Sequence, residues 1–182
     1  MNTVIVLLRG INVGGHKKVP MLELRSLLTL EGYQNLRTYI QSGNVILESA
    51  EDRLKAIEDT VQKAIHSKFG FDVPVIAKTR KELQLIFEAC PFSEVEKENS
   101  YFILLSSVPK KSLVEEVMTI TFENEYFHII KDCLYFYSSI GYGRTKFNMN
   151  SFEKKLKVTA TSRNYKTMLK LMAMSDENEK DH

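Results

Sequence analysis

The sequence predicts an α+β protein built of two ferredoxin-like α/β plaits, each an antiparallel sheet with helices on one face. The apolar run at residues 4–8 does not alternate with polar residues, which indicates a strand buried on both faces. Strand and helix periodicities then follow in the order strand, helix, strand, strand, helix, strand up to residue 79. With right-handed crossovers, that order most simply gives a plait with sheet order 4-1-3-2.

The first half of the chain supplies the elements of one plait. A strand at residues 3–9 precedes a helix that begins near Pro20 and stops before Gly32, the usual positions of these two residue types. Residues 35–49 read as two strands around a Ser-Gly turn, which is a hairpin signal. Ser49 and Asp52 predict a capping box for the next helix, and residues 73–78 a fourth strand.

The second half predicts a second plait that is permuted or incomplete. Capping pairs at Thr79–Glu82 and Ser112–Glu115 predict helices, and three runs rich in aromatic and β-branched residues predict strands. A glycine-containing segment, 141–161, leads to a last helix. We therefore expect one domain at residues 1–79, a second at 80–174, and an acidic disordered tail at 175–182.

Composition narrows the classes of function. The formal charge of +2 divides into −3 in the tail and +5 elsewhere, and residues 144–170 hold eight cations against one acid. Such a cluster is either a solvated face or a surface that attracts anions. Cys90 and Cys133 have no companions at metal-ligand spacing, so we expect no metal and no disulfide framework. Without a signal peptide or an apolar run of membrane-spanning length, we expect a cytoplasmic protein that does not enter a membrane.

The plait topology predicts that two polar segments lie side by side. Strands 1 and 2 run parallel on either side of antiparallel strand 3, so the loop after strand 1 and the hairpin between strands 2 and 3 leave the sheet at the same end. This places Arg9–Lys18 beside Gln41–Asn44. This end of the sheet is suited to bind phosphate or carboxylate, because it combines glycine N–H groups and the start of a helix with an arginine guanidinium and lysines.

Known phosphate loops match this segment poorly. The spacing from Gly10 to Gly15 equals that of a P-loop, but His16 precedes Lys17, and no Ser or Thr follows the lysine. We therefore exclude a P-loop NTPase, and no dinucleotide-binding fingerprint is present. A structural reading stays open, in which Gly14-Gly15 and Ser42-Gly43 only supply turn geometry.

Four motifs resemble the DUF1697 family, a group of bacterial proteins of uncharacterised function. They are "LLRGINVGGHKKVPM", "YIQSGNVIL", "GYGRTK" and "TSRNYKTMLKL", and together they extend over almost the whole chain up to the acidic tail. The resemblance implies two plait domains, and it implies no activity or cofactor. Thr145 and Tyr165 stand where many relatives have serine and tryptophan.

The same resemblance sharpens the list of candidate ligand-binding residues. The two early motifs fall on Arg9, Gly10, Asn12, Gly14 and Gly15, and on Gln41, Ser42, Gly43 and Asn44; Lys17 adds a charge to the first. The two late motifs fall on Gly143, Arg144 and Lys146, and on Thr161, Arg163, Asn164 and Thr167. Thr161 or Ser162 would cap the last helix, whose start would form a second place that favours anions. Whether the early and late clusters share one cleft is open at this point.

Three classes of function fit these residues. The first is a binding protein for a phosphorylated ligand, either a nucleotide or single-stranded nucleic acid, because plaits often stack bases on aromatic residues of their two central strands. Only the second half offers such residues, Tyr101, Phe102, Tyr135, Phe136 and Tyr137, and core packing is the alternative explanation for most of them. The second is an enzyme in which Arg9 and Lys17 stabilise negative charge and His16 transfers protons. The third is an interaction module whose motifs are purely structural. The sequence assigns no catalytic residue and leaves a homodimer open.

Overall fold

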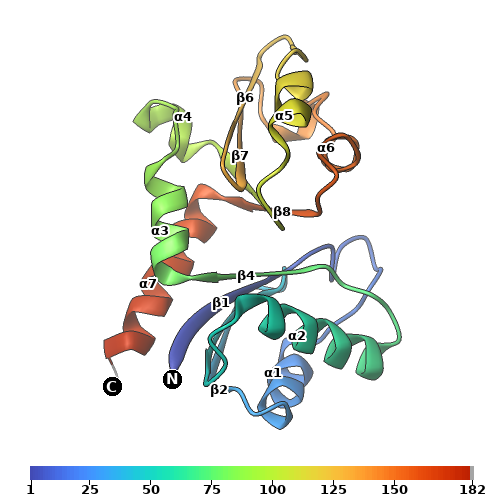
Figure 1. The fold of residues 1–182 in the computed structure, drawn as a ribbon, viewed down its shortest axis with the longest axis vertical. Helices are drawn as coiled ribbons and strands as arrows, with labels where there is room; N and C mark the ends of the chain where they lie inside the picture. Colours follow the sequence, from blue (N-terminus) through green and yellow to red (C-terminus); the bar gives the residue numbers. More distant parts are fainter. Residues whose placement is uncertain (181–182) are drawn as a thin grey trace. The chain divides into compact units, whose positions relative to one another are not determined.

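A computed structural model describes residues 1–180 of the chain and contains two four-stranded antiparallel sheets with helices (Figure 1). In chain order the elements are β1 (Asn2–Leu8), α1 (Met21–Leu30), β2 (Gln34–Tyr39), β3 (Asn44–Ser49), α2 (Leu54–Phe69), β4 (Val75–Thr79), α3 (Arg80–Glu88), α4 (Glu94–Glu98), β5 (Tyr101–Leu105), α5 (Lys111–Val117), β6 (Glu125–Ile130), β7 (Cys133–Ser138), the 3₁₀ helix η1 (Tyr142–Arg144), α6 (Met149–Leu156), β8 (Ala160–Asn164) and α7 (Tyr165–Lys180). None of the helices within these residues is long and apolar enough to cross a membrane.

The chain divides into two compact units. The first comprises Met1–Gln84 together with the residues from Leu169 onward, and the second comprises Leu85–Met168. The expected boundary at residue 79 lies five residues before Gln84, and the part of α7 from Leu169 onward is grouped with the first unit and not with the second.

The first sheet has the strand order β2-β3-β1-β4, which confirms the predicted order 4-1-3-2. Helices α1 and α2 cover one face of this sheet, and Val4, Val6 and Leu8 of β1 pack in the core beneath them (Figure 1). Ile5 and Leu7 point to the opposite face and are also fully buried. The apolar run of β1 is therefore buried on both faces, as its sequence predicts.

The second sheet belongs to a complete plait, so the expectation of a permuted or incomplete one is wrong. Its order, β6-β7-β5-β8, repeats that of the first sheet, and α5 and α6 supply the two crossovers. Strand β8 was not predicted, because its sequence, ATSRN, is mostly polar and lacks the alternation of apolar and polar residues that is typical of a strand. Helix α6 lies inside the segment that we read as irregular; Asn148 caps it by accepting a hydrogen bond from the Ser151 N–H at 3.0 Å.

Helix α3 packs against the face of the second sheet that lies opposite α5 and α6. The Phe87 ring stacks on Phe102 of β5, with 5.5 Å between centroids. The Tyr135 hydroxyl of β7 donates a hydrogen bond of 2.7 Å to the Ile86 carbonyl, and burial raises the pKa of this phenol. Phe102 and Tyr135, on the two central strands, are consequently almost inaccessible to solvent.

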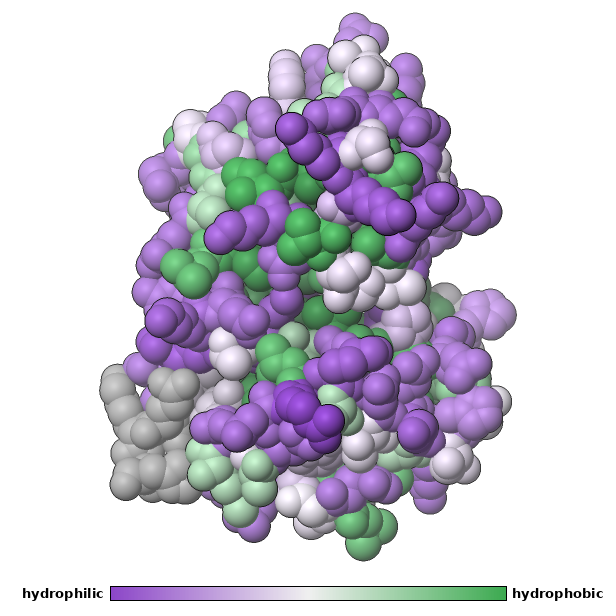
Figure 2. Space-filling model, in the orientation of Figure 1, coloured by the Kyte–Doolittle hydropathy of each residue, from purple (hydrophilic) through white to green (hydrophobic). Residues whose placement is uncertain are grey.

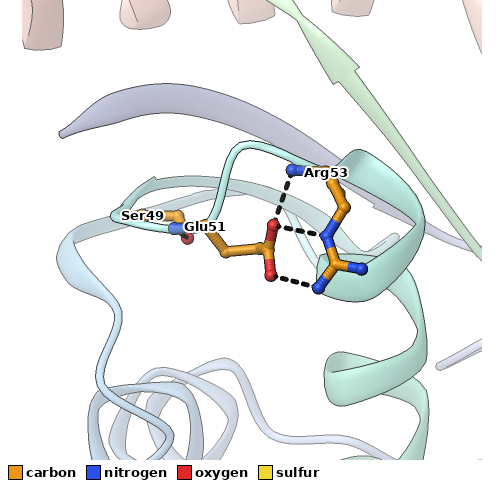
Figure 3. A network of polar contacts seen from close by, with 3 residues as sticks. All are labelled: Ser49, Glu51 and Arg53. Atoms are coloured by element: carbon orange, nitrogen blue, oxygen red, sulfur yellow. Dashed lines mark hydrogen bonds and ion pairs between the residues drawn. The ribbon is translucent and has the colours of Figure 1, made fainter.

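The segment before α2 differs from the expected capping box. The Ser49 hydroxyl accepts a hydrogen bond from the Glu51 N–H, and the Glu51 carboxylate binds the backbone N–H and guanidinium of Arg53 at 2.8–3.1 Å (Figure 3). Hydrogen bonds from Arg53 lower the pKa of Glu51 to about 2. Helix α2 begins only at Leu54, so the pair Ser49–Asp52 lies too early to cap it. The predicted pair Thr79–Glu82, by contrast, does form reciprocal hydrogen bonds at the start of α3.

The predicted disordered tail is helical up to Lys180, so that prediction is wrong for residues 175–180. Ser175 is fully buried. Asp176 pairs with Arg80 at 3.1 Å, and Glu177 pairs with Arg37 of β2 at 2.6 Å. Two of the acidic residues that suggested a disordered tail, Asp176 and Glu177, thus pair with cations of the first unit. Residues 181 and 182 of the predicted tail lie outside the described part of the chain.

The hairpin between β2 and β3 makes a close approach to the end of β1. Gly43 adopts φ +80°, and its carbonyl accepts a hydrogen bond of 2.8 Å from the Leu8 N–H. A Cβ atom at Gly43 would lie 2.6 Å from the Leu8 Cβ and 3.1 Å from the Ile11 Cδ1. Position 43 therefore requires glycine both for its backbone conformation and for space.

We expect Gly43→Ala to lower the free energy of unfolding by about 2 kcal/mol or more, because overpacking adds to backbone strain. Gly10→Ala is the matched control, since Gly10 also has positive φ (+67°) but would place its Cβ in open space. That variant should lose only about 1 kcal/mol. Urea unfolding of both variants measures the difference, and equal losses would contradict the close-approach explanation.

Candidate functional site

The two polar segments of the first unit do converge, as the topology predicts. The Asn12 side chain spans them: its Nδ2 donates to the Gln41 carbonyl at 2.8 Å and to the Val19 carbonyl at 2.9 Å. Its Oδ1 accepts from the Val19 N–H at 2.8 Å. Asn12 therefore ties the loop after β1 to the β2–β3 hairpin and closes the loop on itself.

The glycine pair of this loop forms a tight turn. Gly14 and Gly15 have φ values of +58° and +78°, and the His16 N–H donates to the Val13 carbonyl at 3.1 Å. Positive φ at both central residues is the signature of a type I′ turn. The turn geometry that we left open from the sequence thus accounts for Gly14-Gly15, and His16 lies exposed at its end.

The remaining residues of the early cluster also make contacts within the protein. Asn44 is fully buried and donates from Nδ2 to the Tyr39 carbonyl and the Ser42 hydroxyl. The Lys17 ammonium donates to the Asp72 carbonyl at 2.6 Å, and the Arg9 N–H donates to the Pro74 carbonyl at 3.0 Å. Most polar groups that we expected to face a ligand hold the loops in place.

The first late motif forms an exposed connection in the second unit. Gly143 and Arg144 lie in η1 and are exposed, as is Lys146. The N–H groups of Lys146 and Phe147 donate to the carboxylate of Glu125, which is only 4% exposed, at 2.5 and 3.0 Å. This buried carboxylate therefore fixes the course of the segment that follows η1.

The second late motif lies in β8 and not at a helix start, so Thr161 and Ser162 do not cap α7. Arg163 is buried; its guanidinium donates to the Thr161 hydroxyl at 2.8 Å and to the Ser162 carbonyl at 2.7 Å, and burial lowers its pKa to about 10. The cap is Asn164, whose Oδ1 accepts from the Thr167 N–H at 2.9 Å. Of the four candidate residues in this motif, Thr161, Arg163, Asn164 and Thr167, only Asn164 is exposed, at the point where β8 becomes α7.

A polar cleft of about 590 Å³ opens at that point, which we call the α7 cleft. Tyr101, the first residue of β5, pairs with Phe136 of β7 on one side and with Asn164 of β8 on the other. Residues 98–100 therefore enter between the ends of these two strands. The cleft is lined by Glu98, Asn99, Ser100 and Tyr101, by Tyr137, Ser138, Ser139 and Gly141, and by Asn164, Tyr165 and Lys166.

The charges of the α7 cleft lie on separate segments. Lys166 is in the first turn of α7, and Glu98 is the last residue of α4; both are exposed, and neither forms an ion pair with another residue in the part of the chain that is described. The Ser138 hydroxyl in the cleft wall is shielded from solvent and has no hydrogen-bond partner among residues 1–180. The cleft thus offers one cation and one carboxylate, on separate segments.

The structure brings only part of the predicted site together in this cleft. Asn164 lines it, and so does Gly141, which opens the GYGRTK motif, whereas Gly143, Arg144 and Lys146 do not. Glu98, Asn99 and Lys166 were not predicted. The polar sequence at residues 98–100 did not indicate a ligand site. These residues line a cleft only because the ends of β7 and β8 lie beside them.

Aromatic side chains continue from the α7 cleft across β7 and the edge strand β6 of the second sheet. Tyr137 stacks on Tyr126 at 6.3 Å and contacts Phe92 at 5.9 Å, and Phe92 also contacts His128. In Figure 2, green hydrophobic residues lie among purple hydrophilic ones in the upper half of the face in view, where Figure 1 draws the second sheet. The adjacent helix α4 carries Glu94, Glu96 and Glu98, so this aromatic strip has an acidic border. Within residues 1–180 no three His, Cys, Asp or Glu side chains gather to hold a metal ion.

Two α/β plaits, of which the second carries a polar ligand-sized cleft, define the class of this protein. The chain belongs to the DUF1697 family, a family of unknown function whose model matches residues 1–135. It is similar in fold to a conserved bacterial protein of Streptococcus pneumoniae, SP0830, with a TM-score of 0.72 and 23% sequence identity over 95% of this chain and 98% of that one. The sequence matches no curated protein.

We expect Asn12→Ala to destabilise the fold by about 2 kcal/mol or more, because three hydrogen bonds are lost and the new residue would take the positive φ of Asn12. The control is Gln41→Ala, which keeps the backbone carbonyl that Asn12 binds and changes only an exposed side chain. That control should stay within about 0.5 kcal/mol of wild type in chemical unfolding. A neutral Asn12→Ala would show that the loop does not depend on this side chain.

Proposed function

We propose that the protein binds a small phosphorylated ligand, a nucleotide, in the α7 cleft. The observation that carries the proposal is the meeting of the start of α7, the Lys166 ammonium and tyrosine side chains in one cleft of about 590 Å³. That volume lies within the range of small-molecule sites, roughly 300–1,000 Å³.

The start of α7 supports binding of the phosphate. The first N–H groups of a helix have no partner inside the helix, and the helix dipole places partial positive charge there. The Thr167 N–H is satisfied by Asn164, which leaves those of Tyr165 and Lys166 toward the cleft end of the helix. Together with the Lys166 ammonium, they form an environment that favours a phosphate group.

The tyrosines support binding of the base. Tyr101 and Tyr137 come from neighbouring strands and line the cleft together with Tyr165, whose ring is held against Phe87 at 5.4 Å. Aromatic rings stack on bases of any sequence, and their hydroxyls hydrogen-bond polar edges. Ser138 and Ser139 also line the cleft, although the Ser138 hydroxyl itself is shielded from solvent.

Two features favour a mononucleotide over single-stranded nucleic acid. The central-strand aromatic residues Phe102 and Tyr135, which a plait would use to stack an RNA strand, are covered by α3. The aromatic strip that remains exposed borders the carboxylates of α4, which repel a polyanion.

We also propose that the protein is cytoplasmic, because Cys90 and Cys133 are free thiols.

Thermal unfolding with each of the four 5′-ribonucleoside monophosphates tests the proposal. A nucleotide present at about 100 times its dissociation constant stabilises the fold by roughly 2.7 kcal/mol, which raises Tm by roughly 5–10 °C for a chain of this size. We expect Lys166→Ala to weaken binding about tenfold or more, because it removes the cation beside the phosphate.

Lys170→Ala is the matched control, since Lys170 is an exposed lysine one turn later on α7 and does not line the cleft. It should bind as wild type does. Inorganic phosphate and a short RNA serve as comparison ligands. A larger stabilisation by RNA with a steep loss in salt would replace the mononucleotide by a nucleic-acid strand. No stabilisation by any nucleotide would overturn the proposal.

A further inference from the structure

We infer that Glu98 reads the ribose of the bound nucleotide, so that the α7 cleft selects ribonucleotides over deoxyribonucleotides. This inference rests on the proposed function and names the substrate class of the same site. It starts from the carboxylate of Glu98, which lines the cleft and has no ion-pair partner among the described residues.

The position of Glu98 follows from the sheet. Strand β5 lies between β7 and β8, and the chain leaves α4 and enters β5 through residues 99 and 100. Glu98 and Asn99 therefore line the cleft from the segment that precedes the central strand β5, while Lys166 lines it from the first turn of α7. The carboxylate and the ammonium belong to different segments of the cleft.

The segment of Glu98 and Asn99 presents hydrogen-bond acceptors. An ionised carboxylate accepts hydrogen bonds through both oxygens and donates none. The Asn99 Nδ2 is already engaged, since it donates to the Val95 carbonyl at 2.9 Å, so its Oδ1 is the group left for a ligand. The α7 wall, by contrast, presents donors: the helix N–H groups and the Lys166 ammonium.

A ribonucleotide has the complementary distribution of groups. Its phosphate is an acceptor that carries negative charge, and its 2′- and 3′-hydroxyls are two neighbouring donors that a carboxylate can bind together. Repulsion between Glu98 and the phosphate directs the phosphate to α7 and the sugar hydroxyls to α4. The charge separation in the cleft thus selects both the ligand and its orientation.

A 2′-deoxyribonucleotide would leave one carboxylate oxygen without its donor. Hydrogen bonds to charged groups are stronger than neutral ones, and an ionised acceptor that loses water without gaining a partner weakens binding. We therefore expect wild type to bind the ribonucleotide about tenfold more tightly than the deoxyribonucleotide, or better.

Isothermal titration calorimetry of each 5′-ribonucleotide and its 2′-deoxy counterpart tests the inference on the full chain. Glu98→Gln keeps the size of the side chain but removes its charge and one acceptor oxygen, so the preference for ribose should fall to about threefold or less. Glu94→Gln removes an exposed carboxylate from the same helix that does not line the cleft, and it should keep the full preference.

The outcomes separate the inference from the proposed function. Equal affinities of wild type for the two sugars, or a preference that survives in Glu98→Gln, would overturn ribose recognition by Glu98 while nucleotide binding stands. Failure of every nucleotide to bind wild type would overturn both. A preference that is lost in Glu98→Gln and kept in Glu94→Gln is the result that we expect.

Discussion

The central position of β5, hydrogen-bonded to β7 on one side and to β8 on the other, is the constraint on which the candidate site depends. Because Tyr101 pairs with Phe136 and Asn164 at once, the end of β7, the start of α7 and the segment before β5 meet at one end of the sheet. None of the three segments needs a special loop to reach the cleft. The positions of Glu98 and Lys166 follow from strand pairing and from the cap that Asn164 places on α7.

The two plaits have the same strand order, but the loops at their sheet ends have different roles. In the first, the loop after β1 is closed by Asn12 and by the Gly43 close approach, so its polar residues serve the fold. In the second, α3 covers one face of the sheet, and the exposed side chains of Glu98 and Lys166 at the sheet end have no ion-pair partner within the described chain. A motif rich in glycine and cations is therefore a weaker sign of a ligand site than a cleft lined by charged side chains without ion-pair partners.

The sequence predicted the fold well where burial sets the hydropathy pattern of an element. It predicted the fold poorly where contacts of single polar residues determine the structure. The non-alternating run of β1 and the order of elements sufficed for the first sheet and for the convergence of residues 9–18 with 41–44. Strand β8 was missed because Arg163 is buried through hydrogen bonds to Thr161 and Ser162, an arrangement that no hydropathy pattern reveals. The tail was misjudged because two of its acids, Glu177 and Asp176, pair with Arg37 and Arg80, which are distant in the sequence. Of the cleft residues, Asn164 was predicted to bind a ligand, and Tyr101 and Tyr137 were among the candidate stacking residues. Glu98, Asn99 and Lys166 were not predicted, since they reach the cleft through the strand register.

The most direct test of the central claim is a nuclear magnetic resonance titration of the full chain with the 5′-ribonucleotide that stabilises it most. If the nucleotide occupies the α7 cleft with its phosphate at the helix start, the backbone amides of Tyr165 and Lys166 shift most, together with those of residues 98–101. Shifts confined to residues 9–18 and 41–44 would place the ligand on the early motifs and contradict the account.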